Sequence, residues 1–145
     1  MTAQNIHRIK IKEHLQELKD ALAIGLERRP ATIGFHTSAC AIDMLELFLH
    51  QTGKIPLGKQ IKHEWFKRPK PGQKIKPLAE RHLPFSFPEK EAIFNLCYSI
   101  EESRNTLIYG NAPLPEIKTT WETFLKLKRI LVTLLEGEEF EDANP

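Results

Sequence analysis

Residues 35–53, "FHTSACAIDMLELFLHQTG", are the stretch of sequence that decides the predicted fold. Apolar side chains recur there at spacings of three and four residues, the period of one helix face: Phe35, Ala39, Ile42, Leu45 and Leu49. The run "MLELFLH" (44–50) is apolar on nearly every side. This helix is therefore predicted to be central, or to face a partner as well as the core. Gly53 follows it as a left-handed helix cap.

A helix is also predicted before this stretch, over residues 5–29. Its apolar positions again recur every three or four residues: Ile11, Leu15, Leu18 and Leu22. Pro30 is expected to end it, because proline has no backbone N–H and clashes with the preceding helical turn.

Two further helices are predicted later in the chain. The first starts at "SFPE" (86–89), a capping box in which Ser86 caps the backbone and Glu89 reaches back, and it ends at Tyr109 before Gly110. The second covers about 113–137. Its wide apolar face contains Ile117, Trp121, Phe124, Leu125, Leu131 and Leu135.

Four amphipathic helices with mostly short connections predict an all-α fold, an antiparallel four-helix bundle. Residues 1–137 form one predicted domain, and 138–145 form an acidic tail. Residues 54–85 interrupt the helical pattern with five prolines among basic residues. We expect an irregular basic connection there, with a short helical turn near "IKHEWF" (61–66).

Composition excludes several classes of protein. Hydrophobic residues make up 41% of the chain and charged residues 28%, as in ordinary globular domains. No stretch has the roughly 18 uncharged apolar residues of a membrane span, and the N-terminus is too densely charged for a signal peptide. We therefore expect a cytoplasmic protein without membrane contact. Cys40 and Cys97 are expected to be buried apolar side chains, and neither a metal nor a cofactor is predicted.

Arg104 is the polar exception on the apolar stripe of the third predicted helix, which contains Ile93, Cys97, Ile100 and Leu107. At 100° per residue, position 104 lies about 20° from Cys97 around the helix axis. Three interpretations are open. Arg104 pairs with an internal carboxylate such as Glu101, it extends its charged end into solvent, or it faces a groove that receives an anion.

The segment "SRNTLIYGN" (103–111) resembles the motif helix of the HEPN superfamily of small prokaryotic helical bundles. The family motif is an arginine, often followed by a polar residue, and then a histidine after three more positions. Arg104 and Asn105 match its first two residues, and Tyr109 occupies the histidine position. "HTSACAIDMLELFLHQTGKIP" (36–56) resembles the family's second helix, and the final helix with Trp121 and Phe124 fits as well.

The resemblance implies a protein of a toxin–antitoxin or defence system. Active members are homodimers that cut RNA without metal, and others associate with a minimal nucleotidyltransferase. In such a site Arg104 would hold the phosphate, with Asn105 beside it. Tyr109 is a feeble base because its unperturbed pKa is about 10. The resemblance therefore implies a homodimer that binds RNA or a nucleotidyltransferase with weak or no nuclease activity.

Two alternatives to this function remain. One is a metal-independent endoribonuclease that uses Arg104 and Tyr109. The other is a non-catalytic structural or adaptor bundle that binds a small ligand or protein in its groove, which a pairing of Arg104 with Glu101 would favour. For Tyr109 itself, the non-catalytic interpretation is a ring that packs over the helices with its hydroxyl exposed.

The basic connection is a second candidate site. Its cations could neutralise phosphates: Lys59, Lys62, Lys67, Arg68, Lys70, Lys74 and Lys76. Trp65 and Phe66 lie among them and could stack on bases of single-stranded nucleic acid. The alternative is a solvated lysine-rich loop whose two aromatic side chains anchor it to the bundle.

The histidines give weaker signals. His36 and Cys40 are four residues apart and could share a metal, but two ligands do not make a site. His7 and His14 share one face of the first predicted helix, and we expect both to be exposed.

Overall fold

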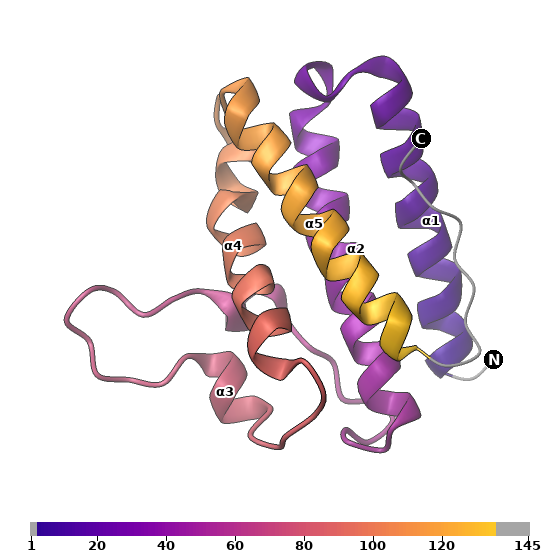
Figure 1. The fold of residues 1–145 in the computed structure, drawn as a ribbon, viewed down its shortest axis with the longest axis vertical. Helices are drawn as coiled ribbons and strands as arrows, with labels where there is room; N and C mark the ends of the chain where they lie inside the picture. The colour runs from indigo at the N-terminus through magenta and orange to yellow at the C-terminus, as the bar shows by residue number, and fades with distance from the viewer. Residues whose placement is uncertain (1–2, 136–145) are drawn as a thin grey trace.

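The computed structural model describes residues 3–135, which are all-helical and contain no β-strand. Four long helices lie side by side (Figure 1): α1 (Ala3–Ile24), α2 (Pro30–Gln51), α4 (Lys90–Tyr109) and α5 (Leu114–Leu134). Shorter helices occupy the connections: η1 (Leu26–Arg28), η2 (His63–Phe66) and α3 (Leu78–His82). The predicted all-α class is confirmed for this part of the chain. None of the described helices is both long enough and apolar enough to cross a bilayer.

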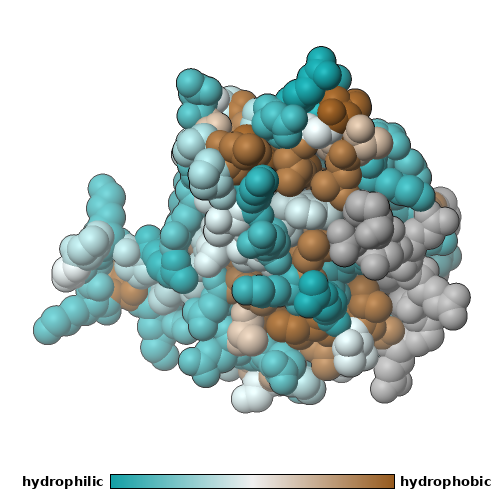
Figure 2. Space-filling view, turned by 45° about the horizontal axis from the view of Figure 1, so that its top comes forward, coloured by the Kyte–Doolittle hydropathy of each residue, from teal (hydrophilic) through white to brown (hydrophobic). Residues whose placement is uncertain are grey.

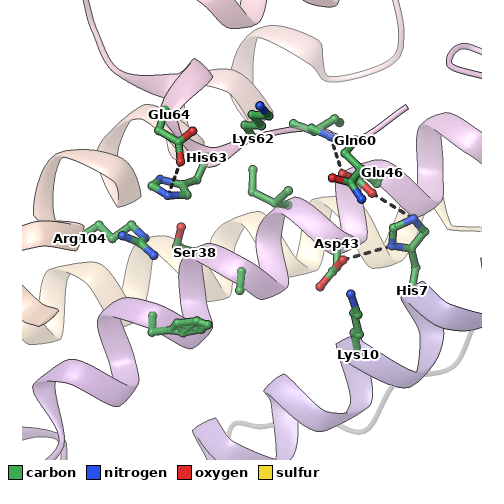
Figure 3. Close-up of a pocket in the computed structure, with 14 residues that line it drawn as sticks. His7, Lys10, Ser38, Asp43, Glu46, Gln60, Lys62, His63, Glu64 and Arg104 are labelled. Carbon is green, nitrogen blue, oxygen red and sulfur yellow. Dashed lines mark hydrogen bonds and ion pairs between the residues drawn. The ribbon is translucent and has the colours of Figure 1, made fainter. Parts of the chain in front are cut away.

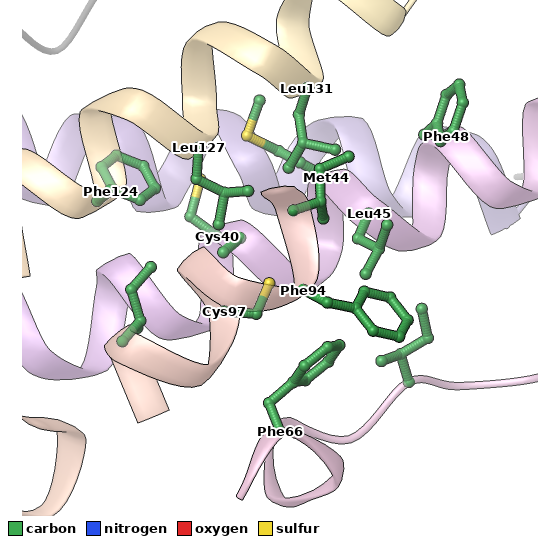
Figure 4. Packing of buried hydrophobic residues seen from close by; sticks show 14 of the residues in the cluster. Cys40, Met44, Leu45, Phe48, Phe66, Phe94, Cys97, Phe124, Leu127 and Leu131 are labelled. Carbon is green, nitrogen blue, oxygen red and sulfur yellow. The ribbon is translucent and has the colours of Figure 1, made fainter. Parts of the chain in front are cut away.

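Helix α2 is the centre of the fold, since it packs against α1, α4 and α5. Its run of apolar residues explains this position, because a helix that is apolar on nearly every side must bury every side. Figure 4 shows the core where α2 meets α4 and α5, with both cysteines inside it. The predicted stripe on α2 is right at Leu45 and Leu49, which are fully buried, and wrong at Phe35, which is 40% exposed.

The end of α1 differs from the prediction. The helix stops at Ile24 rather than near Arg29, because Gly25 adopts a φ of 123°, which helical backbone does not allow. The chain then makes the short helix η1. Pro30 is the first residue of α2, a position where its missing N–H needs no partner.

The predicted capping box at the start of α4 does not form. The helix begins at Lys90, and Glu89 precedes it with a left-handed φ of 63° and no side-chain cap. Phe87 is buried against Phe48 and Phe94, so the chain turns to bury this ring before the helix starts. The Lys90 ammonium donates to two backbone carbonyl oxygens of the preceding turn, at 2.8 Å each. The other end of α4, at Tyr109 before Gly110, is as predicted.

The basic connection is irregular, with the predicted helical turn at η2 and the additional helix α3. Phe66 of η2 is buried and anchors the connection to α4, where it contacts the rings of Phe94 and Tyr98, while the buried Trp65 stacks on His82 of α3. Between η2 and α3 the chain extends away from the helices as an arm (Figure 1), which Figure 2 shows as a mostly hydrophilic projection. The predicted acidic tail, 138–145, lies outside the described residues.

Candidate functional site

Arg104 faces inward from α4, as its place on the predicted stripe indicates. Its side chain is half-buried, and its Nε atom is buried without a hydrogen-bond partner among the described residues. The guanidinium carbon lies 5.9 Å from the centre of the Phe35 ring on α2. A buried donor that lacks a partner costs about 1–3 kcal/mol. Arg104 therefore carries a buried donor that no group in residues 3–135 satisfies, on a side chain that lines a pocket.

Arg104 lines a pocket of about 540 Å³ between α1, α2, α4 and the segment 60–64. Figure 3 shows two groups of polar side chains, one at each end of the pocket. The Arg104 end holds Ser38, His63, Glu64 and Arg104. The His7 end holds His7, Lys10, Asp43 and Glu46.

His63 is the histidine at the Arg104 end of the pocket. Its Nδ1 lies 2.8 Å from Oε1 of Glu101, which is buried, and its Nε2 lies 2.6 Å from Oε1 of the half-exposed Glu64. Glu101 is thus engaged by His63 and not by Arg104, so the internal pair suggested by the sequence is not the one that forms. The buried carboxylate of Glu101 fixes the orientation of the imidazole, and the more exposed Glu64 contacts its other nitrogen.

Asn105 and Tyr109 do not join Arg104 in the pocket. Asn105 is exposed on α4, and Tyr109 is 79% exposed at the end of the helix. Neither side chain lines the pocket. The exposed Tyr109 ring also does not pack over the helices, contrary to the non-catalytic interpretation of this residue.

The predicted cationic residues of the basic connection divide into three groups. Lys62 lines the pocket. Lys59 donates to the His82 carbonyl at 3.3 Å, and Arg68 pairs with Glu102 on α4. The remaining side chains are exposed on the arm: Lys67, Lys70, Lys74 and Lys76. Trp65 and Phe66 are buried, so neither ring is placed to stack on nucleic-acid bases as the sequence suggested, and Phe66 packs on α4 instead.

The His7 end of the pocket is a cluster that the sequence did not predict. His7 Nδ1 lies 3.1 Å from Asp43 Oδ1, and His7 Nε2 lies 3.0 Å from Glu46 Oε2. His14 Nε2 lies 3.2 Å from the other oxygen of Asp43. His7 and His14 are therefore not exposed, contrary to the prediction, because this face of α1 packs on the acidic side of α2.

The sequence contains a signal that could have identified this cluster. Asp43, Glu46 and His50 are spaced by three and four residues, so they share one face of an otherwise apolar helix. His7 and His14 are seven residues apart and share a face of α1. Polar side chains on a buried face of a central helix require hydrogen-bonding partners. The histidines of α1 provide such partners for the carboxylates of α2.

The contacts shift the pKa values of the cluster in opposite directions. Hydrogen bonds with Asp43 and Glu46 raise the pKa of His7 from 6.5 to about 9. Burial would raise the pKa of Asp43, but hydrogen bonds from His14 and His7 outweigh burial and lower it. At neutral pH this end of the pocket therefore holds a protonated His7 between two carboxylates.

The raised pKa of His7 predicts a pH-dependent stability. Imidazolium is favoured in the folded state, so its contribution is complete below about pH 6.5 and is lost as the pH rises through about 9. Asp43 and Glu46 on α2, the stacked His50 ring and nearby Lys10 face this group. At about 1.4 kcal/mol per pKa unit, we expect the free energy of unfolding to fall by roughly 3 kcal/mol between these limits.

Urea unfolding with EDTA present, at intervals from pH 6 to pH 10, measures this loss. His7→Gln should remove most of the slope, and the exposed His82→Gln should retain it. A slope that is the same in wild type and His7→Gln would contradict the assignment.

His36 and Cys40 do not form a metal pair. His36 Nδ1 lies 2.8 Å from His14 Nδ1, and Cys40 is fully buried in the core. Burial raises the pKa of the Cys40 thiol and raises that of Cys97 to about 12, so neither is a reactive thiolate at neutral pH.

No family model, curated protein or solved structure matches this chain. Its candidate site is therefore described by its own geometry: an arginine with an unused donor, a histidine held by a buried carboxylate, and a cluster of histidines and carboxylates in the same pocket.

Proposed function

We propose that this chain is a HEPN-like antiparallel four-helix bundle that binds RNA through its Arg104 pocket. The observation that carries the proposal is the Arg104 guanidinium, which lines a pocket and keeps a buried Nε–H without a partner among the described residues. A phosphodiester offers two non-bridging oxygens that match the planar guanidinium donors.

The charge of the pocket supports an anionic ligand at the Arg104 end. Lys62 lines the pocket with Arg104 and is exposed, whereas Lys10 lies at the His7 end. The carboxylates at the other end are engaged, because Asp43 and Glu46 contact His7. Glu64 at the Arg104 end is paired with His63, which reduces its repulsion of a phosphate.

The basic arm extends the contact with RNA beyond the Arg104 pocket. Its exposed lysines neutralise backbone phosphates without reading sequence, and the buried aromatic residues leave no stacking platform there. We therefore expect salt-sensitive binding with little base preference.

The proposal includes a cytoplasmic homodimer of a toxin–antitoxin or defence system. A nucleotidyltransferase partner follows from the resemblance to the family, whereas the pocket chemistry favours RNA.

A weak ribonuclease is the second candidate, and His63 favours it rather than Tyr109. The exposed Tyr109 lies outside the pocket, whereas His63 shares the pocket with Arg104. Glu101 holds Nδ1 of His63, so its Nε2 could exchange a proton with a ribose hydroxyl once Glu64 moves away. Arg104 would stabilise the charge that develops on the phosphate.

Binding of a fluorescent single-stranded RNA at low salt tests the proposal. Arg104→Gln should weaken binding by roughly 10- to 100-fold, the cost of a charge-assisted hydrogen bond worth about 1.5–3 kcal/mol. Arg129→Gln removes the same charge from an exposed position on α5 and should change affinity little. Equal loss in both variants would show that net charge, and not the pocket, binds the RNA.

The same samples report on cleavage when the RNA is separated by length after incubation with EDTA. Slow cleavage that disappears in both Arg104→Gln and His63→Gln would support the ribonuclease. Intact RNA would support a binding protein, as the replacement of the motif histidine by Tyr109 predicts.

A further inference from the structure

Three metal-ligating side chains meet beside the His7 end of the pocket, and the proposed RNA contact does not use them. His7 on α1 and Glu46 and His50 on α2 each offer a ligand atom, and these atoms lie within 4.8 Å of one another. Glu46 and His50 are four residues apart, so successive turns of α2 place them on one face. His7 reaches the same point from the neighbouring helix.

One of the two ring nitrogens of His50, Nδ1, lacks a partner among the described residues, although the ring also has a hydrogen bond with the Ile55 backbone. The residue is 7% exposed, and its Nδ1 atom is buried without a hydrogen-bond partner within residues 3–135. The ring stacks on His7, with the centroids 5.5 Å apart. Burial lowers the pKa of His50, which favours the neutral imidazole that binds metals. A buried nitrogen without a partner lowers the stability of the protein, and its lone pair could instead bind a cation.

Neighbouring groups hold Glu46 and His7 in place through hydrogen bonds, as groups behind metal ligands do in known metal centres. The backbone N–H of Ile61 donates to Oε1 of Glu46 at 2.5 Å, which leaves Oε2 directed at His7. Asp43 contacts the Nδ1 side of His7 and so positions Nε2 toward Glu46. A carboxylate behind a histidine and a hydrogen bond behind a carboxylate are frequent features of metal centres.

We propose that His7, Glu46 and His50 bind a zinc-type divalent ion. Two imidazoles and one carboxylate form a ligand set that suits zinc and leaves a further coordination position. His7 and Glu46 line the pocket, so this position would face it. The ion takes the place of the proton between His7 Nε2 and Glu46 Oε2. The site is independent of Arg104, which lies at the other end of the pocket (Figure 3).

Titration of the purified, EDTA-stripped and desalted chain with Co²⁺ tests the site directly. We expect visible absorption bands of a four- or five-coordinate ion that saturate at one ion per chain and disappear when Zn²⁺ is added. Zn²⁺ should also raise the melting temperature, because it binds the folded state. His50→Phe keeps the buried ring but removes the nitrogen, and should weaken binding by at least roughly 100-fold.

Glu46→Gln is the second variant, since its amide oxygen can still accept from Ile61, and it decides the test if His50→Phe does not fold. His82→Gln, a histidine outside the cluster that stacks on Trp65, should bind as the wild type does. A folded wild type without saturable Co²⁺ bands would overturn the proposal. So would equal affinity in wild type, His50→Phe and Glu46→Gln, which would show binding elsewhere on the chain.

Discussion

Replacing Phe66 with alanine is expected to lower the free energy of unfolding by about 3–5 kcal/mol, the range for removing a fully buried aromatic ring. Phe66 is 1% exposed, and its ring centre lies 5.3 Å from that of Phe94 and 5.7 Å from that of Tyr98. It is the apolar anchor of η2, the element that carries His63 to the pocket. The substitution should therefore weaken RNA binding as well as the fold.

Chemical denaturation measures the stability, and limited proteolysis reports on the arm that follows η2. Leu57→Ala is the matched control, because Leu57 lies in the same connection but is 71% exposed. Its expected effect is within about 0.5 kcal/mol. A loss below about 1 kcal/mol in Phe66→Ala would contradict the anchoring role of this ring.

Replacing Gly34 with valine is expected to destabilise the protein by about 3 kcal/mol and to displace Arg104. A Cβ at position 34 would lie 2.7 Å from Leu107 Cβ and 3.4 Å from the Arg104 carbonyl oxygen. Both neighbours belong to the same stretch of α4, so the overlap can be relieved only if α2 and α4 move apart. The absence of a side chain at Gly34 thus sets the distance between the helices where Arg104 meets α2.

Ala31→Val controls for the β-branched side chain, since Ala31 is exposed in the first turns of the same helix. We expect this control to lose a few tenths of a kcal/mol at most. RNA affinity should fall in Gly34→Val even under conditions where the variant remains folded. Unchanged stability and affinity in Gly34→Val would show that the helices are not in close contact there.

The sequence predicts the helices better than their ends. The three- and four-residue spacing of apolar side chains places α2 correctly, and the helical angle places Arg104 inward. The ends of α1 and α4 depend on features that periodicity does not show. Gly25 takes a positive φ, and the burial of Phe87 prevails over a capping box with a matching sequence.

The residues that share the pocket with Arg104 could not be predicted from local sequence. His63 reaches the pocket because the burial of Phe66 fixes η2 against α4, a long-range contact that no spacing encodes. The His7 cluster required knowledge of which face of α1 packs on α2. The family motif directed attention to Tyr109, which the end of α4 leaves in solvent.

The central claim is that the unused Arg104 donor receives an RNA phosphate. The NMR signal of the Arg104 Nε–H group, assigned from its disappearance in Arg104→Gln, tests this directly. On addition of a short single-stranded RNA, we predict a progressive shift of this signal and slower exchange of its proton with water, while the signal of the exposed Arg129 changes little. An Arg104 signal that stays in place while the same RNA binds the chain would contradict the account.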